Sequence, residues 1–212
     1  DRDWVIENTL NYSFTLADKH SFNTLLGYTT QSHTYEHMKG EARGYANDNI
    51  TTLNAGTMYA LTSDESEYSM ISYLGRLNYD YKEKYILSVA FRRDGCSRFG
   101  SNAKFANFPS VSVGWIASDE PFMEKYDKVS HLKLRGSYGL VGNYNIGNYT
   151  YLASVGSYNY VTDGSITAGR ALSRIGNNEL TWETTKQMDF GVDLGLFNDR
   201  VFLVYDYYRK WT

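Results

Sequence analysis

The sequence predicts an all-β fold: a transmembrane antiparallel β-barrel wall of about eight strands. Alternation of apolar and polar residues with a period of two recurs eight times along the 212 residues. The composition also favours strands, because the chain holds 20 tyrosines and only 2 prolines. The connections between the runs alternate in length, which is typical of a barrel with short turns at one rim and long loops at the other.

Four of the alternating runs lie in the first half of the chain, over residues 10–16, 22–28, 71–81 and 85–91. In the third run, Arg76, Asn78 and Asp80 share one face, and mainly tyrosine and aliphatic side chains occupy the other. Short polar turns at 17–20 and 82–84 join these runs in pairs. A long polar segment over about 39–67 and a loop over 94–108 are expected to be long connections.

The second half supplies runs over 111–117, 132–140, 188–194 and 201–207. Lys133 and Arg135 fall on the polar face of the second of these. The connection over 119–131 has room for one helical turn, the segment 142–181 is the longest predicted loop, and 198–200 is a tight turn. Short connections are therefore expected after runs one, three, five and seven, and long ones after two, four and six.

Composition excludes several classes of protein. Uninterrupted apolar stretches such as 201–205 are far shorter than the roughly 20 residues of a membrane-spanning helix. A net charge of −3 argues against a nucleic-acid-binding domain. The mean hydropathy of −0.49 fits strands that are wet on one face and long polar loops. A soluble β-sandwich would also alternate its faces, but it would not be expected to sort its connections by length.

Two motifs and one cysteine suggest chemistry that their context does not support. His33 to His37 match the H-x-x-E-H pattern of a zinc protease, which needs a helix, whereas the neighbouring residues favour a strand. The segment from Gly142 to Gly147 has the glycine spacing of a phosphate-binding loop, but the Gly-Lys-Ser/Thr of such a loop is missing. Cys96 is the only cysteine, so no internal disulfide can form, and we expect a buried or loop thiol rather than a catalytic one. No catalytic residue, metal or cofactor is indicated.

From residue 72 onward, several segments occur together in one order. They are YLGRLNYDY (73–81), KYIL (84–87), RDGCSRFG (93–100), FPSVSVGW (108–115), LKLRGSYG (132–139), GNYNIGNY (142–149), LTWETT (180–185) and DYYRK (206–210). In this order they resemble the barrel of SusC/RagA-type TonB-dependent transporters. That family usually carries serine where Cys96 stands, which implies that the thiol is an idiosyncratic substitution in an external loop. The first seventy residues fit the family without a distinctive motif.

The resemblance implies an outer-membrane importer of a Gram-negative bacterium that takes up a glycan or a peptide. It implies a SusD-like surface lipoprotein and the TonB complex as partners, contact with outer-membrane lipid, and no enzymatic step. Family barrels have roughly 22 strands around a plug. Residues 1–212 are therefore expected to be part of the barrel domain, with the signal peptide, the plug and the closing strands absent. The alternative is a self-contained small outer-membrane barrel or a surface binding or adhesion module.

Three sets of candidate site residues follow from this interpretation. An aromatic girdle at the membrane interface is predicted from Tyr79, Tyr81, Tyr85, Trp115, Tyr205 and Tyr207. The polar residues predicted to face the lumen are Arg76, Asn78, Asp80, Lys133 and Arg135. The loop aromatics predicted to contact substrate or lipoprotein lid are Tyr144, Tyr149, Tyr151, Tyr158, Tyr160 and Trp182. Packing of the loops on one another would explain the last set equally well.

Overall fold

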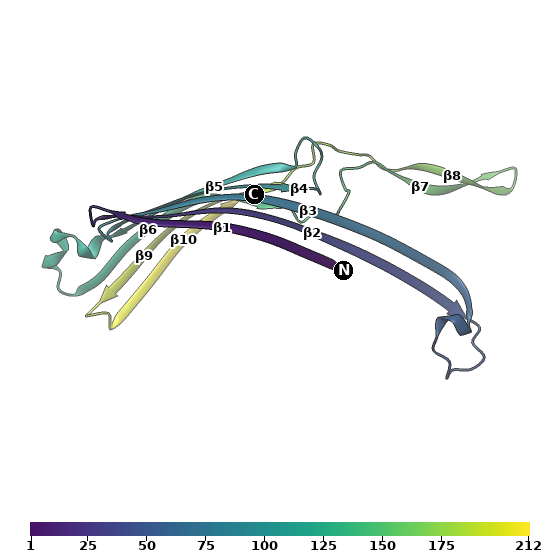
Figure 1. The fold of residues 1–212 in the computed structure, drawn as a ribbon, viewed down its shortest axis with the longest axis horizontal. Helices are drawn as coiled ribbons and strands as arrows, with labels where there is room; N and C mark the ends of the chain where they lie inside the picture. The colour runs from purple at the N-terminus through teal and green to yellow at the C-terminus, as the bar shows by residue number, and fades with distance from the viewer.

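The computed structural model describes residues 1–212 as one curved, open sheet of eight antiparallel strands with a separate two-stranded hairpin (Figure 1). The sheet contains β1 (Arg2–Leu16), β2 (His20–Arg43), β3 (Thr57–Tyr81), β4 (Tyr85–Cys96), β5 (Phe105–Ile116), β6 (Val129–Asn143), β9 (Glu183–Leu196) and β10 (Val201–Trp211), paired in that order. The hairpin consists of β7 (Ser154–Thr162) and β8 (Ser165–Arg174). The predicted all-β class and the eight wall strands are confirmed.

Short 3-10 helices occupy two of the connections. The helix η1 (Leu53–Ala55) lies between β2 and β3, while η2 (Ala117–Asp119) and η3 (Pro121–Lys125) lie between β5 and β6. The helical turn expected in the second of these connections is therefore present. None of the helices has the length and apolarity needed to cross a membrane.

The register aligns the apolar residues of all eight strands into continuous rows on one face. The row that we call the Tyr79 row runs through Phe14, Phe22, Tyr79, Leu87, Val113, Gly136, Phe190 and Tyr207. The neighbouring Trp115 row runs through Leu16, His20, Tyr81, Tyr85, Trp115, Leu134, Val192 and Tyr205. Side chains alternate between faces along each strand, so correct pairing of one position in each strand keeps the whole apolar face continuous.

Polar residues line the opposite face in the same way. One row there runs through Ser13, Asn23, Asn78, Ser88, Ser112, Ser137, Asp189 and Tyr208. Its first four members form a hydrogen-bonded ladder: Asn23 Nδ2 donates to Ser13 Oγ at 2.7 Å, and Ser88 Oγ donates to Asn78 Oδ1 at 2.7 Å. Asn78 Nδ2 completes it by donating to Asn23 Oδ1 at 3.4 Å. The two faces of the sheet therefore differ sharply in chemistry.

The sheet is a single layer, and this decides between the alternatives left open by the sequence. Only 11 of the 212 residues are buried, and no second sheet packs against either face, so the chain is not a β-sandwich. The outermost strands β1 and β10 each pair on one side only. Because the sheet does not close on itself, a self-contained eight-stranded barrel is also not what the structure shows.

The first polar segment is largely strand rather than loop, which corrects the prediction for 39–67. Strand β2 continues to Arg43, β3 begins at Thr57, and the two pair throughout, with one irregularity between Glu41 and Ala42. This part of the hairpin extends beyond the rest of the sheet (Figure 1) and meets no third strand. Neither of its faces has to be apolar, so the alternation that marks a half-buried strand is missing although the backbone pairing is complete.

Three further predictions about connections need correction. Strands β4 and β5 extend into the predicted loop 94–108 and leave only 97–104 unpaired, whereas the connection 117–128 after β5 is longer than that loop and is not short. The predicted loop 142–181 also contains the β7–β8 hairpin. The side of the sheet on which each connection lies is nevertheless as predicted. We call the edge with 17–19, 82–84, 117–128 and 197–200 the short-turn rim, and the opposite edge the long-loop rim.

The unpaired edges generate a prediction for residues 1–212 produced alone. The edge strands expose backbone N–H and C=O groups, which cannot be left unpaired in lipid. We therefore expect the refolded chain to show the same mobility in SDS gels with and without boiling, and to be digested rapidly by proteases. A heat-modifiable, protease-resistant monomer would contradict this expectation.

Candidate functional site at the long-loop rim

The only cluster of buried apolar side chains lies at the long-loop rim. It consists of Cys96, Phe99, Phe108 and Trp182, which are at most 8 % exposed. The Trp182 ring lies 4.8 Å from that of Phe99 and 5.4 Å from that of Phe108, measured between ring centroids. The cluster joins the end of β4, the start of β5 and the two loops 97–104 and 175–182. We call it the loop core.

Local divergence of two strands makes room for the loop core. Pairing of β5 with β6 stops at Ser110 and Gly139, although β6 continues to pair with β9 as far as Asn143. The Phe108 ring occupies the region beyond this point, and a Cβ atom on Gly142 would lie 2.0 Å from it. The indole Nε1 of Trp182 donates to the Lys104 carbonyl oxygen at 3.1 Å, which satisfies its buried N–H group.

Arg98 connects the loop core to the neighbouring loop and to β3. Its guanidinium carbon lies 3.9 Å from the ring centroid of Tyr68 and 5.6 Å from that of Tyr144, in cation–π geometry. Its Nε donates to Asn148 Oδ1 at 2.7 Å, and Asn148 Nδ2 donates to Ser66 Oγ at 2.8 Å. One cationic side chain therefore orders two loops above the polar face of the sheet.

A second polar group supports the same rim from β3 and β4. Arg92 Nε lies 2.7 Å from both carboxylate oxygens of Asp94, and Arg92 Nη2 donates to Ser72 Oγ at 3.1 Å. Asp94 and Ser72 are buried, whereas the Arg92 side chain is 44 % exposed, so only the carboxylate side of this ion pair is shielded from water. The arrangement provides fixed hydrogen-bonding groups and aromatic faces, which suits binding of a polar ligand better than covalent chemistry.

The structure separates the six loop aromatics that the sequence analysis grouped. Trp182 and Tyr144 meet at 6.1 Å in the loop core and its margin. Tyr149 lies beside β3, where its hydroxyl oxygen accepts a hydrogen bond from the Glu67 N–H at 3.2 Å. The Tyr151 carbonyl oxygen accepts a hydrogen bond from the Asn177 N–H at 2.8 Å. Their contact with substrate or lid stays a prediction.

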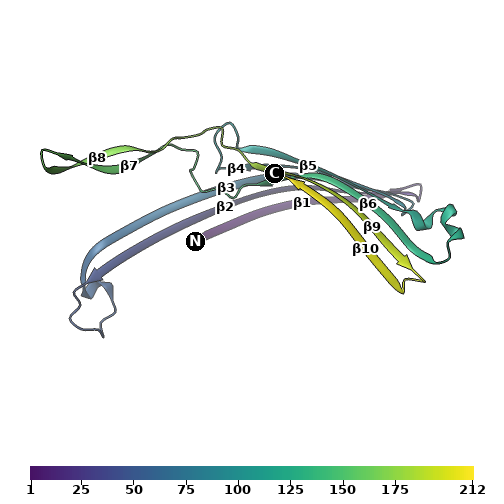
Figure 2. The same cartoon turned by 180° about the vertical axis from the view of Figure 1, so that it is seen from behind.

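Tyr158 and Tyr160, the remaining two, lie on the β7–β8 hairpin. This hairpin projects away from the sheet beyond the long-loop rim (Figure 2). Both rings are about half exposed, at 48 % and 53 %. Their surroundings therefore differ from those of Tyr144 and Trp182, which lie in the loop core or at its margin.

The predicted girdle residues fall in two adjacent rows. Tyr81, Tyr85, Trp115 and Tyr205 belong to the Trp115 row, and Tyr79 and Tyr207 to the Tyr79 row. Both rows lie close to the short-turn rim. A shared level for aromatic side chains at one end of the strands is what a membrane-interface girdle requires.

The predicted lumen residues share the polar face. They are Arg76, Asn78, Asp80, Lys133 and Arg135. Arg135 is paired, because its Nη2 lies 2.9 Å from Asp193 Oδ1 and 2.9 Å from Asp206 Oδ1. This network links β6, β9 and β10 across the polar face.

Two contributors to the site were missed in the sequence. Tyr68 lies between the predicted polar segment 39–67 and the predicted run 71–81, so its place on β3 was not predicted. Arg98 was noted only as part of the family-like stretch 93–100, although an arginine followed by phenylalanine and glycine in a loop was the available signal. Cys96 is the last residue of β4 and is buried in the loop core, which corrects its expected place in an external loop.

The H-x-x-E-H segment lies inside β2. On this strand His33 and His37 share one face and Glu36 lies on the other, as predicted for a strand. His33 hydrogen-bonds Asp3 of the neighbouring strand through Nδ1. The helical geometry that such a zinc site requires is therefore absent here.

Comparison with known proteins gives a consistent result. Residues 1–212 match the family model described as TonB dependent receptor-like, beta-barrel. The chain is 38 % identical to TonB-dependent receptor P39 of Formosa agariphila, over 99 % of this chain and 20 % of that protein. It is 31 % identical to TonB-dependent receptor SusC of Bacteroides thetaiotaomicron, over 82 % of this chain and 18 % of SusC.

Solved structures agree with the sequence relatives. The RagAB peptide transporter superposes with a TM-score of 0.87 at 30 % identity, over 97 % of this chain and 23 % of that one. A RagAB peptide importer in an "open-open" state gives a TM-score of 0.88. The chain spans about a fifth of the length of the curated relatives that it matches.

The loop core generates a prediction about loop order. Replacing Trp182 with alanine in the full-length protein should weaken local packing by about 3 kcal/mol, because a large buried ring is removed. We expect protease to cleave the segment 144–182 faster, with the eight strands of the wall still protected. Tyr160→Ala, which removes an exposed ring, is the matched control and should leave cleavage in the loop core unchanged. Equal protection of Trp182→Ala and the wild type would contradict the assignment.

Proposed function

This chain belongs to the TonB-dependent receptor β-barrel family and is of the SusC/RagA type, and from that premise we propose that it forms part of the wall of an outer-membrane transporter. The transporter imports a glycan or peptide nutrient together with a SusD-like surface lipoprotein. No covalent chemistry is assigned to this part of the protein.

The observation that carries the proposal is the register of the sheet. Eight strands place apolar rows on one face and a hydrogen-bonded polar row on the other. In a barrel wall the apolar face contacts lipid and the polar face lines the lumen. On this assignment the short-turn rim lies on the periplasmic side and the long-loop rim outside the cell.

The long-loop rim supports a role in substrate capture. Arg98, Tyr68 and Tyr144 offer a cation and aromatic faces at the lumen mouth, and these groups suit both sugars and peptides. The name of the RagAB peptide importer favours a peptide among the two substrate classes. Energy for transport would reach the substrate through a plug and the TonB complex, which are outside this chain.

The β7–β8 hairpin supports a partner at the cell surface. A two-stranded hairpin without further packing is at best marginally stable in water. This one exposes large apolar residues on both strands, among them Tyr160, Val161 and Ile166 at 53 %, 76 % and 76 %. We assign the hairpin to contact with the lipoprotein lid, which would cover these side chains.

Replacing the hairpin tests the partner. A full-length variant in which residues 154–174 are exchanged for a short glycine–serine turn should keep its heat-modifiable barrel but copurify with less of the SusD-like lipoprotein from the same bacterium. The control is deletion of residues 46–54 from the connection between β2 and β3, which lies at the same rim. This deletion should not reduce copurification. Unchanged recovery of the lipoprotein would contradict the assignment of the hairpin to the interface.

Opposite substitutions on one strand test the orientation of the wall. An arginine at Val111, on the apolar face, should cost about 2–4 kcal/mol in the full-length barrel, because the charge would lie near the bilayer midplane. Ser112→Arg, on the polar face of the same strand, should have little effect. Unfolding in urea, monitored by gel mobility, measures the free energy of unfolding of both variants. Equal destabilisation, or the reverse order, would contradict the proposed lipid-facing side.

A further inference from the structure

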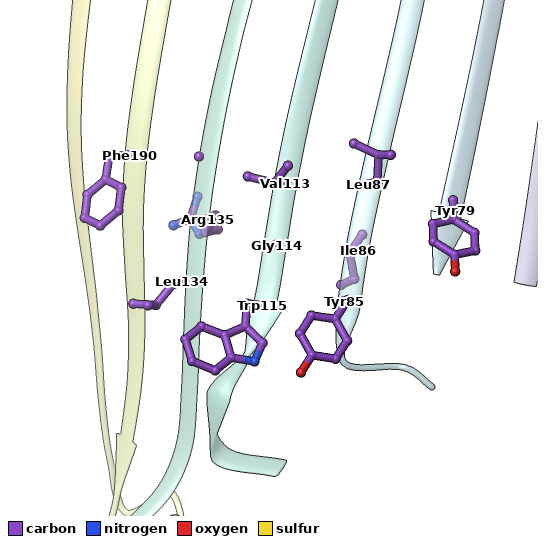
Figure 3. A pocket seen from close by; sticks show the side chains of 11 residues that line it. Tyr79, Tyr85, Ile86, Leu87, Val113, Gly114, Trp115, Leu134, Arg135 and Phe190 are labelled. Atoms are coloured by element: carbon purple, nitrogen blue, oxygen red, sulfur yellow. The ribbon is translucent and has the colours of Figure 1, made fainter. Parts of the chain in front are cut away.

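The apolar face has a gap in the Tyr79 row, at the position of Gly136. This residue pairs with Val113 on one side and Phe190 on the other, and both of these carry side chains on the apolar face. Trp115 and Leu134, one row nearer the short-turn rim, border the gap (Figure 3). The result is a shallow depression of about 490 Å³ whose lining is almost entirely apolar.

The connection 117–128 folds back onto the apolar side of the wall, next to this depression. Tyr85 Oη donates to Glu120 Oε1 at 2.7 Å, and Trp115 Nε1 donates to the same oxygen at 3.4 Å. The Phe122 ring lies 6.2 Å from that of Trp115. Because Tyr85 and Trp115 belong to an apolar row, the residues that contact their side chains must lie on the apolar side of the sheet.

Electrostatics keep Glu120 in its charged form. The hydrogen bond from the Tyr85 hydroxyl lowers the pKa of the Glu120 carboxyl below its ordinary value, with smaller contributions from Trp115 and Lys84. Stabilisation from a lowered carboxyl pKa is fully present above the unfolded value and is lost as the pH falls through the folded value. The connection is therefore held against the wall at neutral pH.

We propose that the depression over Gly136 holds one acyl chain of an inner-leaflet phospholipid, with the connection 117–128 lying at the level of its headgroup. The proposal rests on the proposed function, which places the apolar face in lipid and the short-turn rim on the periplasmic side. Phe122 and Tyr126 are 52 % and 58 % exposed, as expected for side chains that enter the interface. The connection carries charges of both signs, Lys125 and Lys128 beside four acidic residues (Asp119, Glu120, Glu124 and Asp127). Such a mixed set suits a zwitterionic headgroup, whose phosphate the lysines can contact.

The depression fits a single chain better than the rest of the apolar face does. Along the Tyr79 row every strand except β6 presents a side chain, so Gly136 is the one point of this row that lies below the general surface. Its border toward the rim is formed by Trp115, whose position is fixed through Glu120. A flexible hydrocarbon chain fills such a recess without a polar partner, which its lining would not provide.

The test uses the full-length protein in bilayers that contain a phosphatidylethanolamine with a photoactivatable acyl chain. Wild-type protein should give crosslinks concentrated on the peptides around Val113 and Leu134. Gly136→Leu should reduce these crosslinks about tenfold, the change expected when about two methylene groups lose their contact. The substitution has room, because the nearest atom to a new Cβ is Val113 Cγ2 at 3.7 Å.

Gly75→Leu is the matched control. It adds the same side chain on the same apolar face, with Leu26 Cδ2 at 3.8 Å from the new Cβ, but Gly75 does not border the depression. Crosslinking near Val113 should be unchanged in this variant. Gly136→Ala, a smaller substitution, should give an intermediate loss of crosslinks. This variant tests the proposed acyl-chain site if Gly136→Leu fails to fold.

Each other outcome overturns the proposal in a distinguishable way. Even crosslinking along all apolar rows, insensitive to Gly136→Leu, would mean that lipid contacts the wall without a defined chain site; the proposed function would stand. Crosslinks on the polar face and none on the apolar rows would mean that the wall is oriented differently, and the proposed function would fail as well.

Discussion

Pairing of backbone groups between neighbouring strands is the constraint on which the rest of this structure depends. Of 129 backbone hydrogen bonds, 109 lie within the regular elements, and almost no conventional core exists to supplement them. In lipid an unpaired N–H or C=O group costs several kcal/mol, so the ladder cannot be interrupted within the wall. The same ladder sets the register, and a slip of one residue would carry Tyr79 or Trp115 to the opposite face.

The two rims of the sheet are ordered in different ways. At the short-turn rim, Ala17–Asp18 and Lys82–Glu83 adopt positive φ, which matches tight turns to the twist of the strands. At the long-loop rim, which the proposed orientation places outside the bilayer, a small core of Phe99, Phe108 and Trp182 holds the loops. Order at this rim comes from side-chain packing, so it can differ between relatives while the wall is retained.

The proposed transport role and the proposed lipid site use opposite faces of the sheet. On the polar face, Arg135 joins Asp193 and Asp206 across three strands and leaves a fixed, charged lining. On the apolar face, Glu120 holds the β5–β6 connection against Trp115 and Tyr85. A charged residue therefore stabilises each face: Arg135 lies within the wall, and Glu120 lies at its edge.

Sequence alone determined the all-β class, the eight wall strands and which of their residues lie on the apolar face. Alternation of apolar and polar residues, as in Ile71 to Tyr81, is a local pattern that can be seen without the structure. The family-like segments also pointed to the correct family. Tertiary structure decided what has no such period: the solvated extension of β2 and β3, the β7–β8 hairpin, and the convergence of Arg98, Tyr68 and Trp182. These features depend on pairing and packing between residues far apart in the chain, which local alternation does not encode.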